Sequence, residues 1–265
     1  MNVAFHLTNF GLSSRMLSSV GQDELGKDLT LFLKNKGVDT SLLQVDPKHA
    51  TGTVTVQLNE QGTPAYTIIE SVAWDFIKIS EQNQKAVATA DVFVFGSLAA
   101  RNKESCATLR QLLQKANYKV FDVNLRPPFF NQSLLEDFLG IADMVKMNDE
   151  ELELIGKWYF SVIRPSDLAR LVKEKFGIKI LIVTRGGKGA FALDKQSSLF
   201  EVPAKKIRIM DTIGSGDSFL AGFLFQFLLG APLPDCLGFA ARTGALVASR
   251  KGGTPEIDED MVRAL

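Results

Sequence analysis

Short apolar runs of strand length alternate with helix-length amphipathic segments along most of this 265-residue chain. The predicted strands are 15–20, 91–95, 119–123, 143–147 and 179–183. The predicted helices are 24–36, 104–116, 149–157 and 166–176. Strands that are apolar on both faces and separated by helices are typical of βαβ units and a parallel sheet. The alternation therefore predicts an α/β fold with a doubly wound, mostly parallel sheet flanked by helices.

One segment departs from this pattern. Residues 51–70 (TGTVTVQLNEQGTPAYTIIE) alternate apolar or β-branched residues with polar ones, around a turn cluster at 59–62. Such alternation predicts an antiparallel hairpin with one face in water. The sequence contains no long linker, low-complexity tract or internal repeat. We therefore expect one domain over 1–265, with a small β lid at 51–77.

The charge balance and the few metal-binding side chains exclude several classes of function. Thirty basic residues balance thirty acidic ones, so the net charge is zero. A nucleic-acid-binding protein is usually more basic, and we expect no nucleic-acid partner. Cys106 and Cys236 have no CxxC spacing, and the only histidines are His6 and His49. This composition disfavours a structural zinc site and fits a reducing compartment.

No targeting segment is visible in the sequence. The first fifteen residues lack a basic region followed by a sustained apolar core, so a secretory signal is not predicted. The most apolar stretch, 218–233, contains Gln226 and is too short to cross a bilayer. We interpret it as a buried helix, and we expect a cytoplasmic protein with no membrane partner.

The strongest chemical signal is DTIGSGD at 211–217, directly before that apolar stretch. Gly214 and Gly216 allow a tight turn and a close approach of the backbone to a ligand. The following helix would point its unpaired N–H groups at that ligand, which suits a phosphate. A carboxylate at Asp217, beside an anion site, suits a base that accepts a proton during phosphoryl transfer.

A simpler interpretation of this loop also stands. Asp217 could N-cap the helix, with Gly-Ser-Gly as an ordinary turn. The loop is neither a Walker A motif, because no GK[ST] follows, nor a GxGxxG dinucleotide fingerprint.

The loop resembles the DTxGAGD signature of the PfkB (ribokinase-like) family of carbohydrate kinases, with Ser215 where alanine is usual. Other segments resemble further motifs of that family, in the same order. They are VGQDELG at 20–26, TGT at 51–53, FGSLAAR at 95–101, DVNLRPP at 122–128, NDEE at 148–151 and TRGGKG at 184–189. The resemblance spans essentially the whole chain and implies a ribokinase-like fold with a small antiparallel lid.

The resemblance also implies an activity. A member of this family phosphorylates a hydroxyl group of a small sugar with ATP. The middle motifs look like those of fructokinases and favour fructose, while ribose, 2-keto-3-deoxygluconate or a nucleoside stay open. Asp217 would be the catalytic base, and Gly214, Ser215 and Gly216 would form an anion hole for the transferred group.

Further site residues follow from the same resemblance. Asn148 and Glu151 would position Mg²⁺ through water. The ATP site would be lined by Thr184, Gly186 and Gly189, the sugar site by Asn124, Arg126 and Arg101. Backbone carbonyls of Asp211 and Ile213 would hold K⁺. Simpler interpretations remain for three of these motifs: a capping box for N-x-x-E, a plain turn for TRGGKG and a surface arginine for Arg126.

The beginning of the chain departs from the family pattern. Residues 1–4 (MNVA) resemble the tail of the family's GGAPxNVA motif. The Gly-Gly pair, the sugar-binding aspartate and the first strand are absent. We therefore expect the natural start to lie upstream and the sheet to have an unpaired edge or a gap. In an alternative, this chain is an N-terminally truncated family member with little or no catalysis. Lid strands of relatives pair between subunits, which implies a homodimer.

Overall fold

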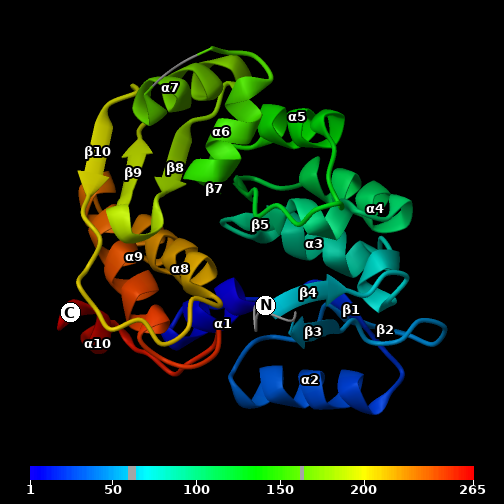
Figure 1. The fold of residues 1–265 in the computed structure, drawn as a ribbon. Coiled ribbons are helices and arrows are strands. Elements are labelled where there is room, and N and C mark those ends of the chain that lie inside the picture. Colours follow the sequence, from blue (N-terminus) through cyan, green and yellow to red (C-terminus); the bar gives the residue numbers. More distant parts are fainter. Residues whose placement is uncertain (59–63, 162–163) are drawn as a thin grey trace. The chain divides into compact units, whose positions relative to one another are not determined.

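A six-stranded sheet forms the centre of the fold (Figure 1). The computed structural model describes residues 1–58, 64–161 and 164–265. The strand order is β10-β9-β8-β7-β6-β5. The strands are β5 (Phe93–Gly96), β6 (Lys119–Asp122), β7 (Met144–Asn148), β8 (Ile180–Thr184), β9 (Ala190–Leu193) and β10 (Leu199–Val202). β5 to β8 are parallel, whereas β9 and β10 are antiparallel to their neighbours, so the sheet is mixed.

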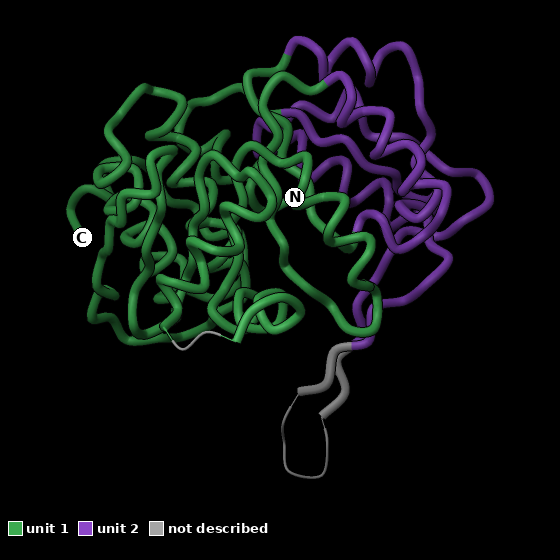
Figure 2. The backbone as a smooth tube through the Cα atoms, turned by 90° about the horizontal axis from the view of Figure 1, so that it is seen from above, with its two compact units in different colours: residues 1–14, 90–98, 116–265 green, residues 15–89, 99–115 purple. Residues whose placement is uncertain are grey.

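The chain packs as two compact units (Figure 2). The first unit contains the six-stranded sheet and comprises residues 1–14, 90–98 and 116–265. The second comprises residues 15–89 and 99–115. The expectation of one domain with a lid at 51–77 stays a prediction.

Helices cover both faces of the sheet in the first unit. On one face, Val120, Met144 and Ile182 pack against α1 (Asn2–Asn9), α8 (Ser215–Leu228), α9 (Leu233–Ala248) and α10 (Glu259–Arg263). On the other face lie α5 (Gln132–Ile141), α6 (Asp149–Lys157) and α7 (Pro165–Phe176). Successive strand residues point to opposite faces, which is why strands apolar throughout can be buried on both sides.

The predicted helix over 218–233 is wrong at both ends. The helix α8 starts earlier, at Ser215, and ends at Leu228. Gly230 follows with a φ of +77°, and α9 begins at Leu233. Apolar composition continues through the break, whereas the left-handed glycine and the proline after it stop the helix. The predictions for α6 and for β5 to β8 are correct to within two residues.

The second unit contains two small sheets. In one, β1 (Ser18–Gly21) pairs in parallel with β2 (Leu43–Asp46). In the other, β3 (Val54–Leu58) and β4 (Pro64–Ile68) form the predicted antiparallel hairpin. The predicted turn at 59–62 lies outside the described residues. The remaining elements are α2 (Glu24–Asn35), η1 (Ala73–Phe76), α3 (Glu81–Thr89) and α4 (Lys103–Leu113).

The first predicted strand, 15–20, is displaced: regular pairing begins only at Ser18, because Arg15 makes a single isolated bridge to Asp39. Among the described residues, β1 pairs with β2 alone, and β5 pairs with β6 alone. None of the described helices has the length and apolar character that crossing a bilayer requires.

Two of the segments that resemble family motifs, VGQDELG at 20–26 and TGT at 51–53, contact each other within the second unit. Asp23 N-caps α2 by accepting a hydrogen bond from Gly26 N. The same carboxylate accepts hydrogen bonds from Thr51 N (2.8 Å) and Thr51 Oγ1 (2.6 Å). A methyl group on Gly21 would lie 2.6 Å from Thr51 N, so the close approach of the two segments requires glycine there. VGQDELG and TGT are therefore held together by the hydrogen bonds between Asp23 and Thr51.

Candidate active site

The loop 211–217 ends in a left-handed glycine at the start of α8. Gly214 is the N-cap residue, with a φ of +75°. A methyl group at this position would lie 2.6 Å from Gly253 Cα. Both the conformation and the contact require glycine, as the sequence predicts for a tight turn.

Asp217 is the third residue of α8 and lies in its first turn. The helix has no side-chain cap, so the interpretation of Asp217 as an N-cap is wrong. Its Oδ2 instead accepts a hydrogen bond of 2.7 Å from Asn2 Nδ2, which comes from α1. The carboxylate thus contacts α1 and is only partly buried.

Ser215 and Gly216 differ from each other in their contacts. Ser215 N donates to Thr212 O (3.2 Å), and Ser215 Oγ donates to Gly244 O (3.0 Å). Gly216 lies inside the helix and has no positive φ. A methyl group on Gly216 would lie 3.1 Å from Lys146 Nζ. First-turn N–H groups of a helix have no acceptor within it, so those of Gly216 and Asp217 are the ones suited to an anion.

The carboxylate of Asp211 binds this loop to the segment after α9. Its Oδ1 accepts from Ile213 N (2.9 Å) and its Oδ2 from Gly252 N (3.0 Å). These two hydrogen bonds lower the pKa of Asp211. Asp211 and Ile213, the predicted K⁺ residues, thus belong to one turn in which the side chain of Asp211 orders the backbone.

Asn148 and Glu151 form the capping box that was the simpler interpretation of this motif. Asn148 Oδ1 accepts from Glu151 N (2.8 Å), and Glu151 Oε2 accepts from Asn148 N (2.9 Å). Glu151 Oε1 also accepts from Leu125 N, which joins the loops after β6 and β7. Because these oxygens are engaged by the backbone, they fit Mg²⁺ through bound water rather than by direct coordination. The described residues contain no cluster of three or more His, Cys, Asp or Glu side chains able to hold a metal.

The predicted sugar-binding residues of the first unit follow β6. Asn124 has a positive φ of 39°, an uncommon backbone conformation for a residue other than glycine. Arg126 is exposed, and its Nη1 donates to Leu125 O. Both residues lie beyond the carboxyl end of a parallel strand, where open α/β sheets bind ligands.

The predicted nucleotide-binding residues lie at the turn between β8 and β9. Thr184 ends β8, and Gly186 starts the short helix η3 (Gly186–Lys188). A methyl group on Gly186 would meet nothing within 4 Å, so this glycine borders open space. One on Gly189 would clash with Val202 O, and that glycine therefore has a structural reason. The plain turn between two antiparallel strands is thus also present.

A buried ion pair that no sequence motif predicted lies beside the loop. Lys146 Nζ lies 3.0 Å from Asp122 Oδ1, and the two side chains are 7% and 8% exposed. Burial, with the neighbouring carboxylates of Asp217 and Glu151, raises the pKa of Asp122 to about 6, although Lys146 opposes the shift. A lysine inside an apolar strand carries no motif, and only its rarity in buried strands could have marked it.

His6 on α1 is a second residue near the loop that no sequence motif predicted. His6 is fully buried, and its Nε2 donates to Gly253 O (3.0 Å), the residue that packs on Gly214. Its Nδ1 has no hydrogen-bond partner among the described residues. Burial lowers the pKa of His6, while the bond to Gly253 and the charge of Asp217 act in the opposite direction.

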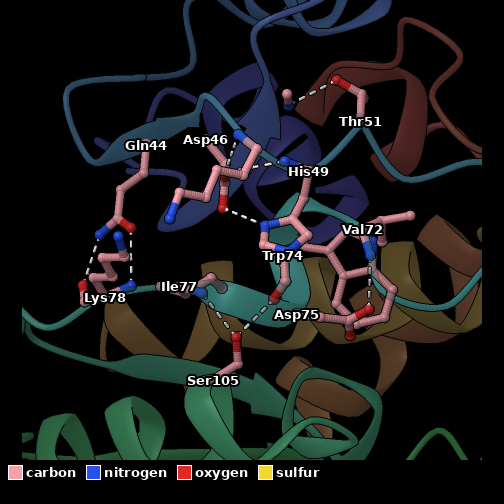
Figure 3. Close-up of polar contacts among 12 residues, drawn as sticks. Gln44, Asp46, His49, Thr51, Val72, Trp74, Asp75, Ile77, Lys78 and Ser105 are labelled. Carbon is pink, nitrogen blue, oxygen red and sulfur yellow. Dashed lines mark hydrogen bonds and ion pairs between the residues drawn. The ribbon is translucent and has the colours of Figure 1, made fainter.

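Arg101 belongs to the second unit, where its guanidinium forms an ion pair with Asp75. The two side chains are 4% and 1% exposed, and Arg101 Nε lies 2.7 Å from Asp75 Oδ1. Arg101 also lies over the ring of Trp74, 4.0 Å from its centroid. Figure 3 shows Asp75 and Trp74 on η1, where Asp75 Oδ2 accepts from Val72 N (3.1 Å). In the same figure, Ser105 Oγ accepts from Ile77 N and donates to Trp74 O, which ties α4 to this segment.

Comparison with known proteins decides the family. The family model described as pfkB family carbohydrate kinase matches residues 1–260. The chain belongs to the pfkB family of carbohydrate kinases. It is 30% identical to a fructokinase of Salmonella typhimurium over 268 residues, which covers 95% of this chain and 85% of that protein.

Solved structures share the ribokinase-like fold of this chain. A fructokinase of Vibrio cholerae, with fructose, ADP and calcium bound, matches with a TM-score of 0.84 and 24% identity, covering 99% of this chain and 88% of that one. A sugar kinase of Pyrococcus horikoshii in complex with ATP matches with a TM-score of 0.80 and 27% identity, covering 96% and 82%.

Proposed function

We propose that this carbohydrate kinase transfers the γ-phosphoryl group of ATP to a hydroxyl group of fructose, with Asp217 as the general base. The observation that carries the proposal is the orientation of Asp217. Its carboxylate lies in the first turn of α8, does not cap that helix and is held by Asn2. A base at this place can accept a proton beside the N–H groups that suit a phosphate.

The chemistry follows from these positions. As the sugar oxygen attacks the γ-phosphorus, its proton moves to Asp217, and the bond from that phosphorus to the bridging oxygen of ADP breaks. The N–H groups at the start of α8, assigned to the anion hole of Gly214, Ser215 and Gly216, would stabilise the charge on the transferred group. Because Ser215 N already donates to Thr212 O, we assign the larger share to Gly216.

Fructose and ATP are supported by the relatives. The Vibrio cholerae fructokinase was solved with fructose and ADP, and the Pyrococcus horikoshii sugar kinase with ATP. We assign the nucleotide to Thr184, Gly186 and Gly189, and the sugar to Asn124, Arg126 and Arg101. Mg²⁺, when bound, would neutralise phosphate charge, with Asn148 and Glu151 orienting its water ligands. K⁺ at the carbonyls of Asp211 and Ile213, and a homodimer through β3 and β4, belong to the same proposal.

The test is sugar-dependent ADP release with ATP, Mg²⁺ and K⁺. Fructose is compared with ribose, 2-keto-3-deoxygluconate and a nucleoside. Asp217→Asn should lower turnover by roughly 10²- to 10⁴-fold, the usual contribution of a general base, while ATP still binds. Asp235→Asn is the matched control, because Asp235 is an exposed aspartate in the first turn of α9.

The outcomes separate the alternatives. Turnover that is highest with another sugar would replace fructose and leave the base assigned. Unchanged turnover in Asp217→Asn would remove Asp217 from the mechanism. ATP binding without turnover on any sugar would support the alternative of a chain with little or no catalysis.

A further inference from the structure

Lys146 projects from β7 toward the start of α8. It is two residues from Met144 and from Asn148, and residues two apart share one face of a sheet. Met144 belongs to the core between the sheet and α8, so Lys146 lies on the same face. Its partner Asp122 stands two residues after Val120, another member of that core. The ion pair therefore lies on the α8 face, at the carboxyl ends of β6 and β7.

The ammonium of Lys146 lies directly against the position where a side chain at residue 216 would begin. A methyl group on Gly216 would lie 3.1 Å from Nζ and 3.9 Å from Cε of Lys146. Gly216 has no positive φ, so its backbone conformation suits any residue. The absent side chain leaves room for the ammonium against the first turn of α8.

The electrostatics of this arrangement are unusual. The N-terminus of a helix is a positive dipole end, and a cation beside it is unfavourable unless negative charge is near. Three carboxylates act on Lys146, those of Asp122, Glu151 and Asp217, and they raise its pKa against the effect of burial. Among the described residues, Asp122 is the one that forms an ion pair with Lys146. Two positive groups, the helix end and the ammonium, thus converge on one place beside the proposed base.

We propose that Lys146 is a further catalytic residue of this kinase: its ammonium, held by Asp122 against Gly216, contacts the transferred phosphoryl group at the start of α8. The inference rests on the proposed function and adds one residue to it. Asp122 acts through Lys146 as a positioning residue. The lysine and the helix N–H groups then share the negative charge of the transferred group.

The first test measures binding without turnover. The affinities of ADP and of a non-hydrolysable ATP analogue, both with Mg²⁺, are compared by calorimetry in the wild-type chain and in Lys146→Met. The analogue carries the γ-phosphoryl group and ADP does not. Loss of a charge-assisted hydrogen bond should weaken the analogue about 10- to 100-fold and ADP less than about threefold. Lys146→Arg and Asp122→Asn should lie between Lys146→Met and the wild type.

Lys173→Met is the matched control. Lys173 is also a buried lysine of the first unit, 6% exposed. It belongs to α7, and its Nζ donates a hydrogen bond to Ser197 Oγ. This variant should keep the wild-type ratio of the two affinities. Thermal unfolding checks that each variant is folded. If Lys146→Met does not fold, Lys146→Arg is used in its place.

The second test measures turnover on the best sugar. Lys146→Met should lower kcat about 10²- to 10³-fold, the effect of removing one donor to a developing charge, with the KM for the sugar nearly unchanged. If Lys146→Met weakens the binding of ADP and of the analogue equally, or weakens the binding of neither, the proposal is overturned. The sugar kinase activity then still stands. If Lys146→Met changes the affinity ratio but the wild-type chain phosphorylates no sugar, the proposed function is overturned and Lys146 stays assigned to the phosphate.

Discussion

Asn2 Nδ2 donates a hydrogen bond of 2.7 Å to Asp217 Oδ2, joining the first turn of α1 to the first turn of α8 across 215 positions of the chain. The same amide nitrogen lies close to Gly253, where a methyl group would come within 3.1 Å of it. Gly253 in turn packs on Gly214. The start of the chain therefore orients the proposed base and supports the loop that precedes it.

Replacement of Asn2 tests this orientation. Asn2→Ala removes a hydrogen bond to a charged group, so kcat should fall about 10- to 100-fold. Steady-state kinetics on the best sugar measure this loss. Asn9→Ala, on the other end of α1, should leave kcat unchanged. An unchanged kcat in Asn2→Ala would show that the bond has no part in orienting the base.

The two glycines of the loop should respond differently to alanine. Gly214→Ala forces a left-handed backbone and a contact with Gly253, so it should cost about 1–3 kcal/mol in the free energy of unfolding. Gly216→Ala meets only the flexible end of Lys146 and gains helix propensity, so stability should change by less than about 1 kcal/mol.

Turnover should distinguish these variants further. Gly216→Ala displaces the ammonium of Lys146, so its kcat should fall although the protein remains stable. Chemical denaturation and steady-state kinetics measure the two effects separately. Equal losses of stability at both positions would contradict the assigned reasons.

His6 should make stability depend on pH. Burial lowers its pKa below the ordinary value of 6.5, so the unfolded chain binds a proton more readily than the folded one. The stabilising contribution of neutral His6 is fully present above pH 6.5 and is lost as the pH falls below that value, by up to about 1.4 kcal/mol per pH unit. His6→Gln keeps a donor for Gly253 O and should flatten the dependence in urea unfolding curves. A slope equal to that of the wild type would assign the effect to another group.

The ion pair of Asp75 and Arg101 should stabilise the second unit only as a pair. Arg101→Met leaves a buried carboxylate and should cost about 3–5 kcal/mol, whereas the double variant with Asp75→Leu should cost less than the sum of the single ones. The exposed pair of Glu153 and Lys157 serves as the control, with an expected change below about 1 kcal/mol. Additive losses in the buried pair would contradict coupling. Denaturation curves of the wild type, the two single variants and the double variant measure these terms, with a corresponding set for the control pair.

Local patterns were sufficient for much of the fold. The alternation of apolar strands with amphipathic helices predicted β5 to β8 and α6, because both periodicities are expressed within a few neighbouring residues. The capping box of Asn148 and Glu151 and the hairpin of β3 and β4 are local in the same sense. Family motifs then located the loop 211–217, since its glycines and its aspartate are contiguous.

Tertiary structure alone decided which distant groups meet at that loop. In the sequence, Asn2 is one residue of a helix, Lys146 one residue of a strand and His6 one residue of an apolar face. Each reaches Asp217, Gly216 or Gly253 only because α1 and the sheet pack against α8, and those contacts join positions far apart in the chain. Periodicity and spacing carry no information about such contacts, because long-range packing selects the partners after the local elements have formed.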